Sequence, residues 1–395
     1  MKAQGSFAIL AILWFTCFWN YSCQQVAISL LPTLQESLSL STAAIGFLVS
    51  LFFLGFSFSF LVSGYLCNRL GRVKTIFLCI PLVMLFMLSI SFSTDFLTIL
   101  VLEPLLGFGT GLYHPAALSL LSSLFSSRER GKYLGVHEAA VPAGMTVGPV
   151  FVGLMLNFGL GWNQTFQLWI VPGAVILLSQ FLLLKVKEGR QQPSFEDEPS
   201  ADAVHRLVPW AAISLLILVA AYFLRNVANS EVTLLPEYWV SDFGVEVGTA
   251  AFIYGIMRVF AIFGQVGVGY LSDIFGRLRV LIIIQTLQTF LLISTSYLEF
   301  GPLLFASYAM FSILQNSFMP VMFALVSDHS HPKKLSKNIG IVMSIGGIAT
   351  VISPTILGLL AQSYSFRIAW LYPIATAFMA IPLLLLLRNS LKARI

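Results

Sequence analysis

The sequence predicts an all-α membrane protein with twelve transmembrane helices arranged as two similar six-helix bundles. Three observations carry this prediction: the composition, the number of apolar segments of membrane-spanning length, and a repeat of the first half in the second. Of the 395 residues, 57% are hydrophobic and 10% are charged, against roughly 45–50% and about 25% in soluble domains. This balance excludes disulfide-rich secreted scaffolds, disordered chains and nucleic-acid-binding proteins.

Twelve apolar segments are long enough to cross a bilayer, which takes about 20 residues per helix. In the first half we expect spans at residues 6–31, 44–66, 74–92, 96–122, 133–158 and 165–184. In the second half we expect them at residues 208–235, 247–271, 279–297, 301–326, 338–362 and 366–387. The first segment follows Lys2 as a signal peptide would, but it is too long for one and is expected to remain as a span.

A single long polar stretch, from Lys185 to Arg206, separates the two halves. It contains Pro, Ser and charges of both signs without apolar periodicity, which is typical of a flexible linker. We therefore expect an N-terminal bundle at residues 1–187, a cytoplasmic linker at 188–206 and a C-terminal bundle at 207–395.

The distribution of basic residues predicts the orientation of the chain, because cytoplasmic loops retain Lys and Arg. Loops after even-numbered spans hold clusters such as Arg69, Arg72 and Lys74, and both ends of the chain are basic. The opposite loops are acidic and contain one base, Arg367. Both termini are expected to be cytoplasmic, so the net charge of +5 reflects topology and not nucleic-acid binding.

The second half repeats the first at a constant offset of 205 residues. Gly64-Tyr65-Leu66 recurs as Gly269-Tyr270-Leu271, and the same offset relates Gly71 to Gly276 and Pro149 to Pro354. One register without gaps indicates a duplicated unit. Because each unit has an even number of spans, the bundles are expected to share an orientation, related by an axis along the membrane normal.

A duplicated loop carries the resemblance to a known family. The first copy contains Gly64, Asn68, Arg69, Gly71 and Arg72, and the second contains Gly269, Asp273, Gly276 and Arg277. Both copies resemble the signature loop of the major facilitator superfamily, which implies a gating role between inward- and outward-open states. Its glycines are expected to let helices approach closely, while its charges lock the cytoplasmic helix ends. Asn68 stands where the first copy usually has Asp, so the lock is expected to be weaker there. A plain basic turn would explain the arginines but not the repeated glycine spacing.

Span five contains a second pattern of small residues, formed by Gly135, Gly144, Gly148, Pro149 and Gly153. It resembles the antiporter motif of the superfamily, although Val152 replaces one of the usual glycines. The resemblance implies an exporter that exchanges its substrate for protons. The alternative is ordinary helix packing, because Gly and Pro are common in membrane helices.

Span four combines a family-like glycine run with a departure from the family. Gly107, Gly109 and Gly111 match the fourth-span motif, but Glu103 occupies the position that usually holds Arg. The role of that Arg therefore does not carry over. The following Tyr113-His114-Pro115 is loosely similar to exporters of the fosmidomycin-resistance type.

Polar residues inside the predicted spans are the candidate substrate contacts, because ionisable groups at bilayer depth are costly and functional by default. Arg225 and Asn229 lie four residues apart on one face of span seven, and Asn20 and Gln24 match them in span one. Arg258 in span eight and Gln315 in span ten complete the candidate substrate site. Two buried cations favour an anionic substrate. The alternative is a structural role, with an Arg paired to Glu231 or to backbone carbonyls.

Proton coupling requires a side chain that gains and loses a proton as the cavity opens to either side. Glu103 is our first candidate and His114 our second. His137 and Glu138 are expected to lie near the cytoplasmic end of span five and to extend toward nearby Arg side chains. Glu231 is expected near the outer end of span seven, in contact with water.

The sequence thus favours a secondary transporter that works by alternating access, most simply proton-coupled export of a small organic solute, with an anion favoured. The alternative is a proton-coupled symporter that imports an organic anion or a sugar. An enzyme is disfavoured because the five histidines form no catalytic cluster, and a channel would lack the duplicated gating loop. We expect protons, a small-molecule substrate and the lipid bilayer as partners. We expect neither a cofactor nor a metal, and a monomer in a prokaryotic cytoplasmic membrane.

Overall fold

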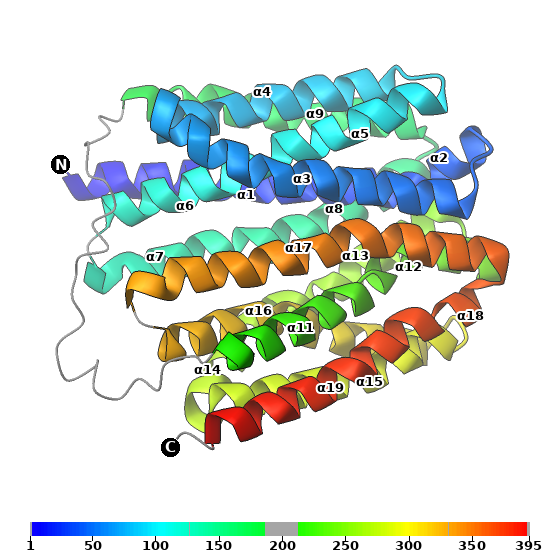
Figure 1. Cartoon of the computed structure of the whole chain (residues 1–395). Coiled ribbons are helices and arrows are strands. Elements are labelled where there is room, and N and C mark those ends of the chain that lie inside the picture. Colours follow the sequence, from blue (N-terminus) through cyan, green and yellow to red (C-terminus); the bar gives the residue numbers. More distant parts are fainter. Residues whose placement is uncertain (1, 126, 186–211, 331, 393–395) are drawn as a thin grey trace. The chain divides into compact units, whose positions relative to one another are not determined.

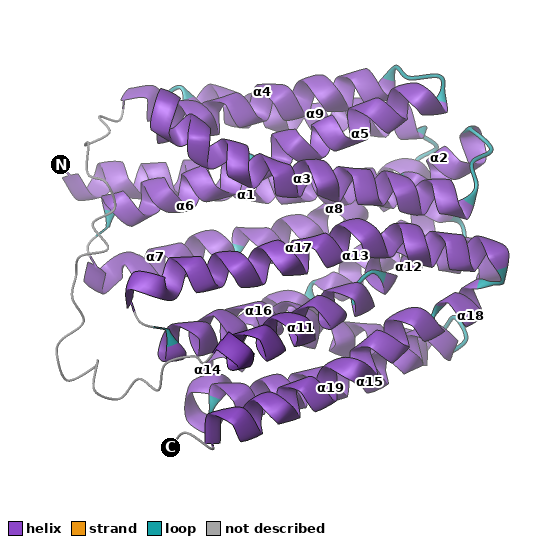
Figure 2. Cartoon of the chain, viewed as in Figure 1, coloured by secondary structure: helices purple, strands orange, loops and turns teal. Residues whose placement is uncertain are grey.

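The computed structural model describes residues 2–125, 127–185, 212–330 and 332–392. Within these ranges the chain consists of helices joined by short turns and has no β-strand (Figure 2). Helices form because the segments are apolar, and a backbone in lipid must satisfy its hydrogen bonds within its own helix. The all-α prediction is confirmed, and the expected linker lies outside the described residues.

The helices of the first half follow the predicted spans closely (Figure 1). They are α1 (Lys2–Ser29), α2 (Leu31–Ser37), α3 (Thr42–Leu70), α4 (Arg72–Ser91), α5 (Phe96–Gly111), α6 (Tyr113–Leu124), α7 (Ser127–Glu138), α8 (Ala140–Asn157), α9 (Trp162–Gln180) and the 3-10 helix η1 (Leu183–Lys185). Asp95 caps α5, and its hydrogen bonds from the Thr98 hydroxyl and backbone N–H lower the pKa of this exposed carboxyl group.

The second half contains the corresponding set of helices. They are α11 (Ala212–Ala228), α12 (Glu231–Phe243), α13 (Val247–Arg258), α14 (Phe260–Phe275), α15 (Arg277–Tyr297), α16 (Pro302–His329), α17 (Pro332–Ser363), α18 (Phe366–Ala369) and α19 (Leu371–Lys392). Gly71 and Gly276 separate equivalent helices in the two halves with φ angles of 91° and 89°. The repeat in sequence is therefore also a repeat in backbone conformation.

Eleven stretches in the described ranges are long and apolar enough to cross a membrane. Some of them combine two helices, such as α5 with α6 and α11 with α12. The sixth predicted span corresponds to α9, which has 19 residues but begins with a polar turn that contains Asn163, Gln164 and Gln167. That polar turn lowers its mean hydropathy.

Backbone contacts divide the chain into two compact units. The first unit is Met1–Pro193 with Pro236–Ile256, and the second is Ser194–Leu235 with Met257–Ile395. The divisions fall within α12 and α13, so each of these helices contributes to both units. The predicted domain limits at residues 187 and 207 remain predictions, because 186–211 lie outside the described residues.

Small residues set the distances between helices in the first unit, where α3 packs on α5 and α1 packs on α8. A Cβ atom on Gly107 would collide with the Phe52 carbonyl of α3, and one on Gly55 would collide with the Pro104 carbonyl of α5. Such reciprocal contacts hold membrane helices together by close packing. In the second unit α11 packs on α19 and α14 packs on α16.

Two kinks in the first unit have a proline as their cause. A proline has no N–H to donate to the carbonyl four residues earlier. Pro115 thus leaves the Gly111 carbonyl free beside the break at Leu112, and Pro142 leaves the Glu138 carbonyl free beside the break at Ala139. Both break residues keep helical φ and ψ angles, so each span bends without reversing. The kinks place Tyr113, His114 and Glu138 at the joints.

Candidate functional site

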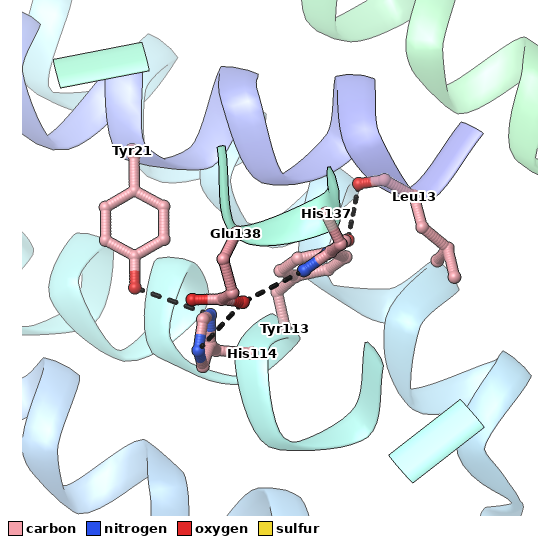
Figure 3. A network of polar contacts seen from close by, with 6 residues as sticks. All are labelled: Leu13, Tyr21, Tyr113, His114, His137 and Glu138. Atoms are coloured by element: carbon pink, nitrogen blue, oxygen red, sulfur yellow. Dashed lines mark hydrogen bonds and ion pairs between the residues drawn. The ribbon is translucent and has the colours of Figure 1, made fainter. Parts of the chain in front are cut away.

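A network of ionisable side chains lies at two helix joints of the first unit, one between α5 and α6 and one between α7 and α8 (Figure 3). Glu138 Oε1 lies 3.0 Å from His137 Nδ1 and 3.7 Å from His114 Nε2. His114 Nδ1 lies 3.4 Å from the Tyr21 hydroxyl of α1. One carboxyl group therefore contacts two imidazoles.

The far side of His137 is anchored to the backbone of α1. His137 Nε2 lies 2.8 Å from the Tyr113 hydroxyl, which donates to the Leu13 carbonyl at 2.5 Å. His137 and Tyr113 are fully buried. This chain of contacts fixes the imidazole ring in place.

The expectation that His137 and Glu138 extend toward cytoplasmic Arg side chains stays a prediction, because the side chains of residues 126–132, Arg128 and Arg130 among them, lie outside the described ones. Both ion pairs of Glu138 in the described part of the chain are with histidines. His137 is enclosed by Tyr113 of α6 and by α1, whereas a third of the Glu138 side chain is exposed.

The two residues predicted for proton coupling have different surroundings. His114 belongs to the network of Figure 3. Glu103 is buried on α5, and within the described ranges no hydrogen bond or ion pair reaches its carboxyl group. The structure thus places His114, but not Glu103, in this network.

The second unit contains a buried guanidinium group held by neutral partners. Arg225 Nη2 donates to the Gln315 carbonyl at 2.6 Å and lies 3.4 Å from Gln288 Oε1. The guanidinium carbon stands 4.2 Å from the centroid of the Phe318 ring, a cation–π contact. Arg225 Nε has no hydrogen-bond partner.

Arg225 also borders a small cavity. Its lining consists of Arg225, Ala228, Asn229, Gln285, Gln288, Thr289, Leu292, Phe311 and Ala377. Gln288 Nε2 donates to Asn229 Oδ1 at 3.1 Å. Its enclosed volume of about 10 Å³ is that of a site for one water-sized group, so a carboxylate enters only if the cavity widens.

Sequence reasoning missed Gln285 and Gln288. Both lie on α15, three residues apart and therefore on one face, and both are buried. Two amides in an otherwise apolar predicted span were the signal that could have found them.

The other predicted substrate contacts are distributed over both units. Asn20 donates to the Thr16 carbonyl and accepts from Cys79 Sγ, and Gln24 is buried with no partner for Oε1. Gln315 faces Arg225 through its backbone carbonyl and not its side chain. Arg258 is buried as the last residue of α13 and is not part of the cavity lining.

The expectation of a water-exposed Glu231 is wrong, and Glu231 does not pair with Arg225. The other form of the structural alternative, an Arg held by backbone carbonyls, agrees with the hydrogen bond from Arg225 to the Gln315 carbonyl. Glu231 is buried and accepts a hydrogen bond from Thr295 Oγ1 at 2.7 Å. The physical reason is that α15 covers this end of span seven with a hydroxyl group. Glu231 Oε2 has no hydrogen-bond partner.

The two copies of the signature loop hold their arginines differently. Arg277 Nε lies 2.8 Å from Asp328 Oδ2, and its Nη2 lies 3.4 Å from Asp273 Oδ1. In the first copy Arg72 Nη1 donates to the Ser119 carbonyl at 3.1 Å, and Arg69 stands over the Tyr65 ring. Exposed Asn68 cannot pair with a cation as Asp273 does, which agrees with the weaker lock expected there.

Glycines of the two motifs serve different purposes. Gly144 and Gly148 pack against Phe18, Ser22 and Gln25 of α1, and Gly153 packs against Gly248 and Phe252 of α13. A Cβ atom added to Gly64 or Gly135 would meet nothing within 4 Å, so the close approach expected of these two is absent. Gly71 and Gly276 are instead required by their positive φ angles.

A family description, Major Facilitator Superfamily, matches residues 13–294 and 232–394 of this chain. The chain is 22% identical over 278 residues to the Hexuronate transporter of Bacillus subtilis (strain 168), a match that covers 69% of this chain and just under two thirds, 66%, of that protein. It is 22% identical over 386 residues to Multidrug resistance protein MdtG of Proteus mirabilis (strain HI4320), a match that covers 93% of both chains.

The fold agrees with solved structures of transporters. A bacterial homolog to the human lysosomal transporter Spinster, in an inward-facing and occupied conformation, matches with a TM-score of 0.81 and 16% identity. The match covers 98% of this chain and 97% of that chain. Because the family match extends over nearly the whole sequence, the chain belongs to the Major Facilitator Superfamily and is a membrane transporter of small solutes, not an enzyme.

Proposed function

We propose that this transporter exports a small organic anion in exchange for protons. The observation that carries the proposal is the surroundings of Arg225. Its hydrogen-bond partners in the described part of the chain are an amide oxygen and a carbonyl, and no carboxylate lies within ion-pair distance. A buried charge without a counter-ion is costly. A substrate carboxylate that reaches Arg225 when the adjoining cavity widens would supply the missing charge.

The cavity also suggests how the substrate is oriented. The guanidinium group offers a planar fork that suits carboxylate, and the amides of Asn229 and Gln288 offer hydrogen bonds to hydroxyl groups. We extend the proposed substrate contacts to Asn20, Gln24, Arg258 and Gln315. Two six-helix bundles at residues 1–187 and 207–395 would then alternate access around them.

Export in exchange for protons is favoured by the motif in span five, whose Gly144, Gly148 and Gly153 pack closely, and by the similarity to a multidrug resistance protein. The second candidate is proton-coupled import of an organic anion or a sugar. It is favoured by the similarity to a hexuronate transporter, since hexuronates are carboxylated sugars. We place the monomeric protein in a prokaryotic cytoplasmic membrane with both termini in the cytoplasm.

Transport by proteoliposomes tests the anion site and the direction of coupling together. Radiolabelled D-glucuronate and a trapped pH dye are used with wild type, Arg225→Gln, Arg225→Lys and the exposed control Arg367→Gln. Loss of charge-assisted hydrogen bonds worth about 1.5–3 kcal/mol should lower the affinity by about tenfold or more in Arg225→Gln. Arg225→Lys should lose less, and Arg367→Gln should match wild type.

The dye separates the two directions. With an antiporter, glucuronate entry makes the lumen more alkaline, whereas with a symporter it makes the lumen more acidic. Wild-type affinity in Arg225→Gln would rule out the proposed anion site.

A further inference from the structure

Glu138 is positioned between two imidazoles at the joint of α7 and α8 (Figure 3). Its Oε1 atom makes both contacts, 3.0 Å to His137 Nδ1 and 3.7 Å to His114 Nε2. His137 is completely buried, while 18% of the His114 side chain and 33% of the Glu138 side chain are exposed. The three groups thus lead from a partly accessible edge to a closed interior.

The hydrogen bonds of Tyr113 determine which nitrogen of His137 carries a hydrogen. A tyrosine hydroxyl has one hydrogen to donate, and a backbone carbonyl can only accept. The hydroxyl hydrogen of Tyr113 therefore points to the Leu13 carbonyl, 2.5 Å away. The contact of 2.8 Å between the same oxygen and His137 Nε2 then requires Nε2–H as the donor.

This tautomer has a consequence at the other ring nitrogen. A neutral imidazole with Nε2–H has a bare lone pair on Nδ1. That lone pair would face Glu138 Oε1 at 3.0 Å, and an ionised carboxylate oxygen is also an acceptor. Two acceptors at this distance repel, so one proton must lie between them, on Nδ1 or on Oε1.

We propose that His137 and Glu138 form the proton-binding site of this transporter, and that His114 passes the proton to and from Glu138. The proposal rests on the proposed proton-coupled transport and assigns its proton to one place. The structure would then represent the proton-loaded state. The step balances, because the proton leaves the pair for His114 Nε2 and leaves behind a neutral His137 and a carboxylate.

Few titratable groups surround the pair among the described side chains, which exclude Arg128, Glu129, Arg130 and Lys132 of α7 itself. The helices that pack on α7 are α1, α6 and α8. The titratable side chains that they and α7 bring to Glu138 are Cys17, Tyr21, Tyr113, His114 and His137. Neither α6 nor α8 contains a Lys or an Arg. Among the described side chains the imidazoles are therefore the groups that lie close enough to exchange a proton with Glu138.

The location of the pair links its proton to the conformation of span five. Glu138 is the last residue of α7, and Pro142 leaves its carbonyl without a helical hydrogen bond. Loss of the proton would break the contact between His137 and Glu138 and loosen this joint. The next turns of α8 carry Gly144 and Gly148, which pack on α1, so the change would reach a helix pair of the first unit.

Nitrogen NMR of the full-length protein with ¹⁵N-labelled histidine tests the shared proton without any substrate. The chain has five histidines, and His137→Gln assigns the signal of interest. At about neutral pH we expect His137 to show a protonated or proton-sharing Nδ1 in wild type and in the control Glu299→Gln, which changes an exposed carboxyl group. In Glu138→Gln we expect a bare Nδ1. A bare Nδ1 in wild type, or a signal unchanged by Glu138→Gln, would overturn the proposal.

Transport of D-glucuronate separates this proposal from the proposed function. Glu138→Gln should lose accumulation driven by a pH gradient but keep glucuronate–glucuronate exchange, which needs no net proton movement. The exposed control Glu299→Gln should keep both. Gradient-driven accumulation by Glu138→Gln would overturn the proton site. Wild type that shows the shared proton but moves no protons with any carboxylate would overturn the proposed function and leave the site standing.

Discussion

Glu231 is a buried carboxyl group that depends on one hydroxyl group. Thr295 Oγ1 lies 2.7 Å from Glu231 Oε1 and 2.9 Å from the Leu292 carbonyl, and its one hydrogen serves one of them at a time. Glu231 Oε2 has no partner. Removal of one partner of a buried polar group costs more than the net value of the hydrogen bond, because the remaining group stays buried. Loss of the Thr295 hydroxyl is therefore expected to lower the free energy of unfolding more than loss of a threonine hydroxyl that bonds only to a backbone carbonyl of its own helix.

The variant Thr295→Val tests this dependence. We expect the free energy of unfolding to fall by about 1–3 kcal/mol, measured by thermal denaturation in detergent. Thr286→Val is the control, since Thr286 lies on the same helix and its hydroxyl donates only to the Ile282 carbonyl. Equal effects of the two substitutions would contradict the role given to Thr295.

At the residue scale, the sequence revealed where charge is buried but not what surrounds it. Arg225 was predicted because a charge in an apolar run is visible without a structure. The pairing of His137 with Tyr113 joins residues 24 positions apart through a bend in span four, and no pattern of hydropathy encodes it. Pro115 and Pro142 stand beside the bends, but Pro104 and Pro149 of the same two spans lie inside unbroken helices, so a proline alone does not locate a bend.

At the scale of elements, the contact between α3 and α5 relies on two glycines. Gly107 meets the backbone of Phe52, and Gly55 meets the backbone of Pro104. A backbone carbonyl cannot move aside as a side chain can, so an added methyl group must separate the helices. A Cβ atom on Gly64, which also belongs to α3, would meet nothing within 4 Å.

Gly107→Ala and Gly64→Ala should therefore change stability in opposite directions. We expect Gly107→Ala to lower the free energy of unfolding by about 1–3 kcal/mol through overpacking. Gly64→Ala should raise it by about 0.5–1 kcal/mol, because alanine favours the helix. Thermal unfolding of both variants checks the prediction, and a stabilising Gly107→Ala would refute it.

The spans themselves were predictable because length and hydropathy determine a membrane helix. The sequence did not predict that span four divides into α5 and α6, or that span five divides into α7 and α8. The break residues Leu112 and Ala139 keep helical angles, so each helix bends where a hydrogen bond is missing and no turn residue marks the place. The candidate proton site lies at these unmarked joints.

At the scale of the whole molecule, the repeat in the sequence predicted the fold. Gly71 and Gly276 share a positive φ angle, and Pro149 and Pro354 both lie inside helices. The weakest element is α9, whose polar first turn keeps it outside the eleven clearly apolar spans. An N-terminal half with six spans requires α9 to cross the bilayer.

Reporter fusions test whether α9 is a true span. Alkaline phosphatase, active only outside the cytoplasm, and green fluorescent protein, fluorescent only inside, are each fused after Leu160 and after residue 195. We expect active phosphatase at the first site and fluorescence at the second, because six crossings return the chain to the cytoplasm. The same reporter response at both sites would mean that α9 does not cross.

The proton shared by His137 and Glu138 also has an electrical consequence. With the proton the pair is neutral, and without it the pair carries one negative charge. At one proton per monovalent anion, symport would move no net charge. Antiport with export would carry two positive charges inward per cycle, and each charge gains about 2.3 kcal/mol per 100 mV of membrane potential. The exporter would thus be driven by voltage as well as by the pH gradient, whereas the importer would be indifferent to voltage.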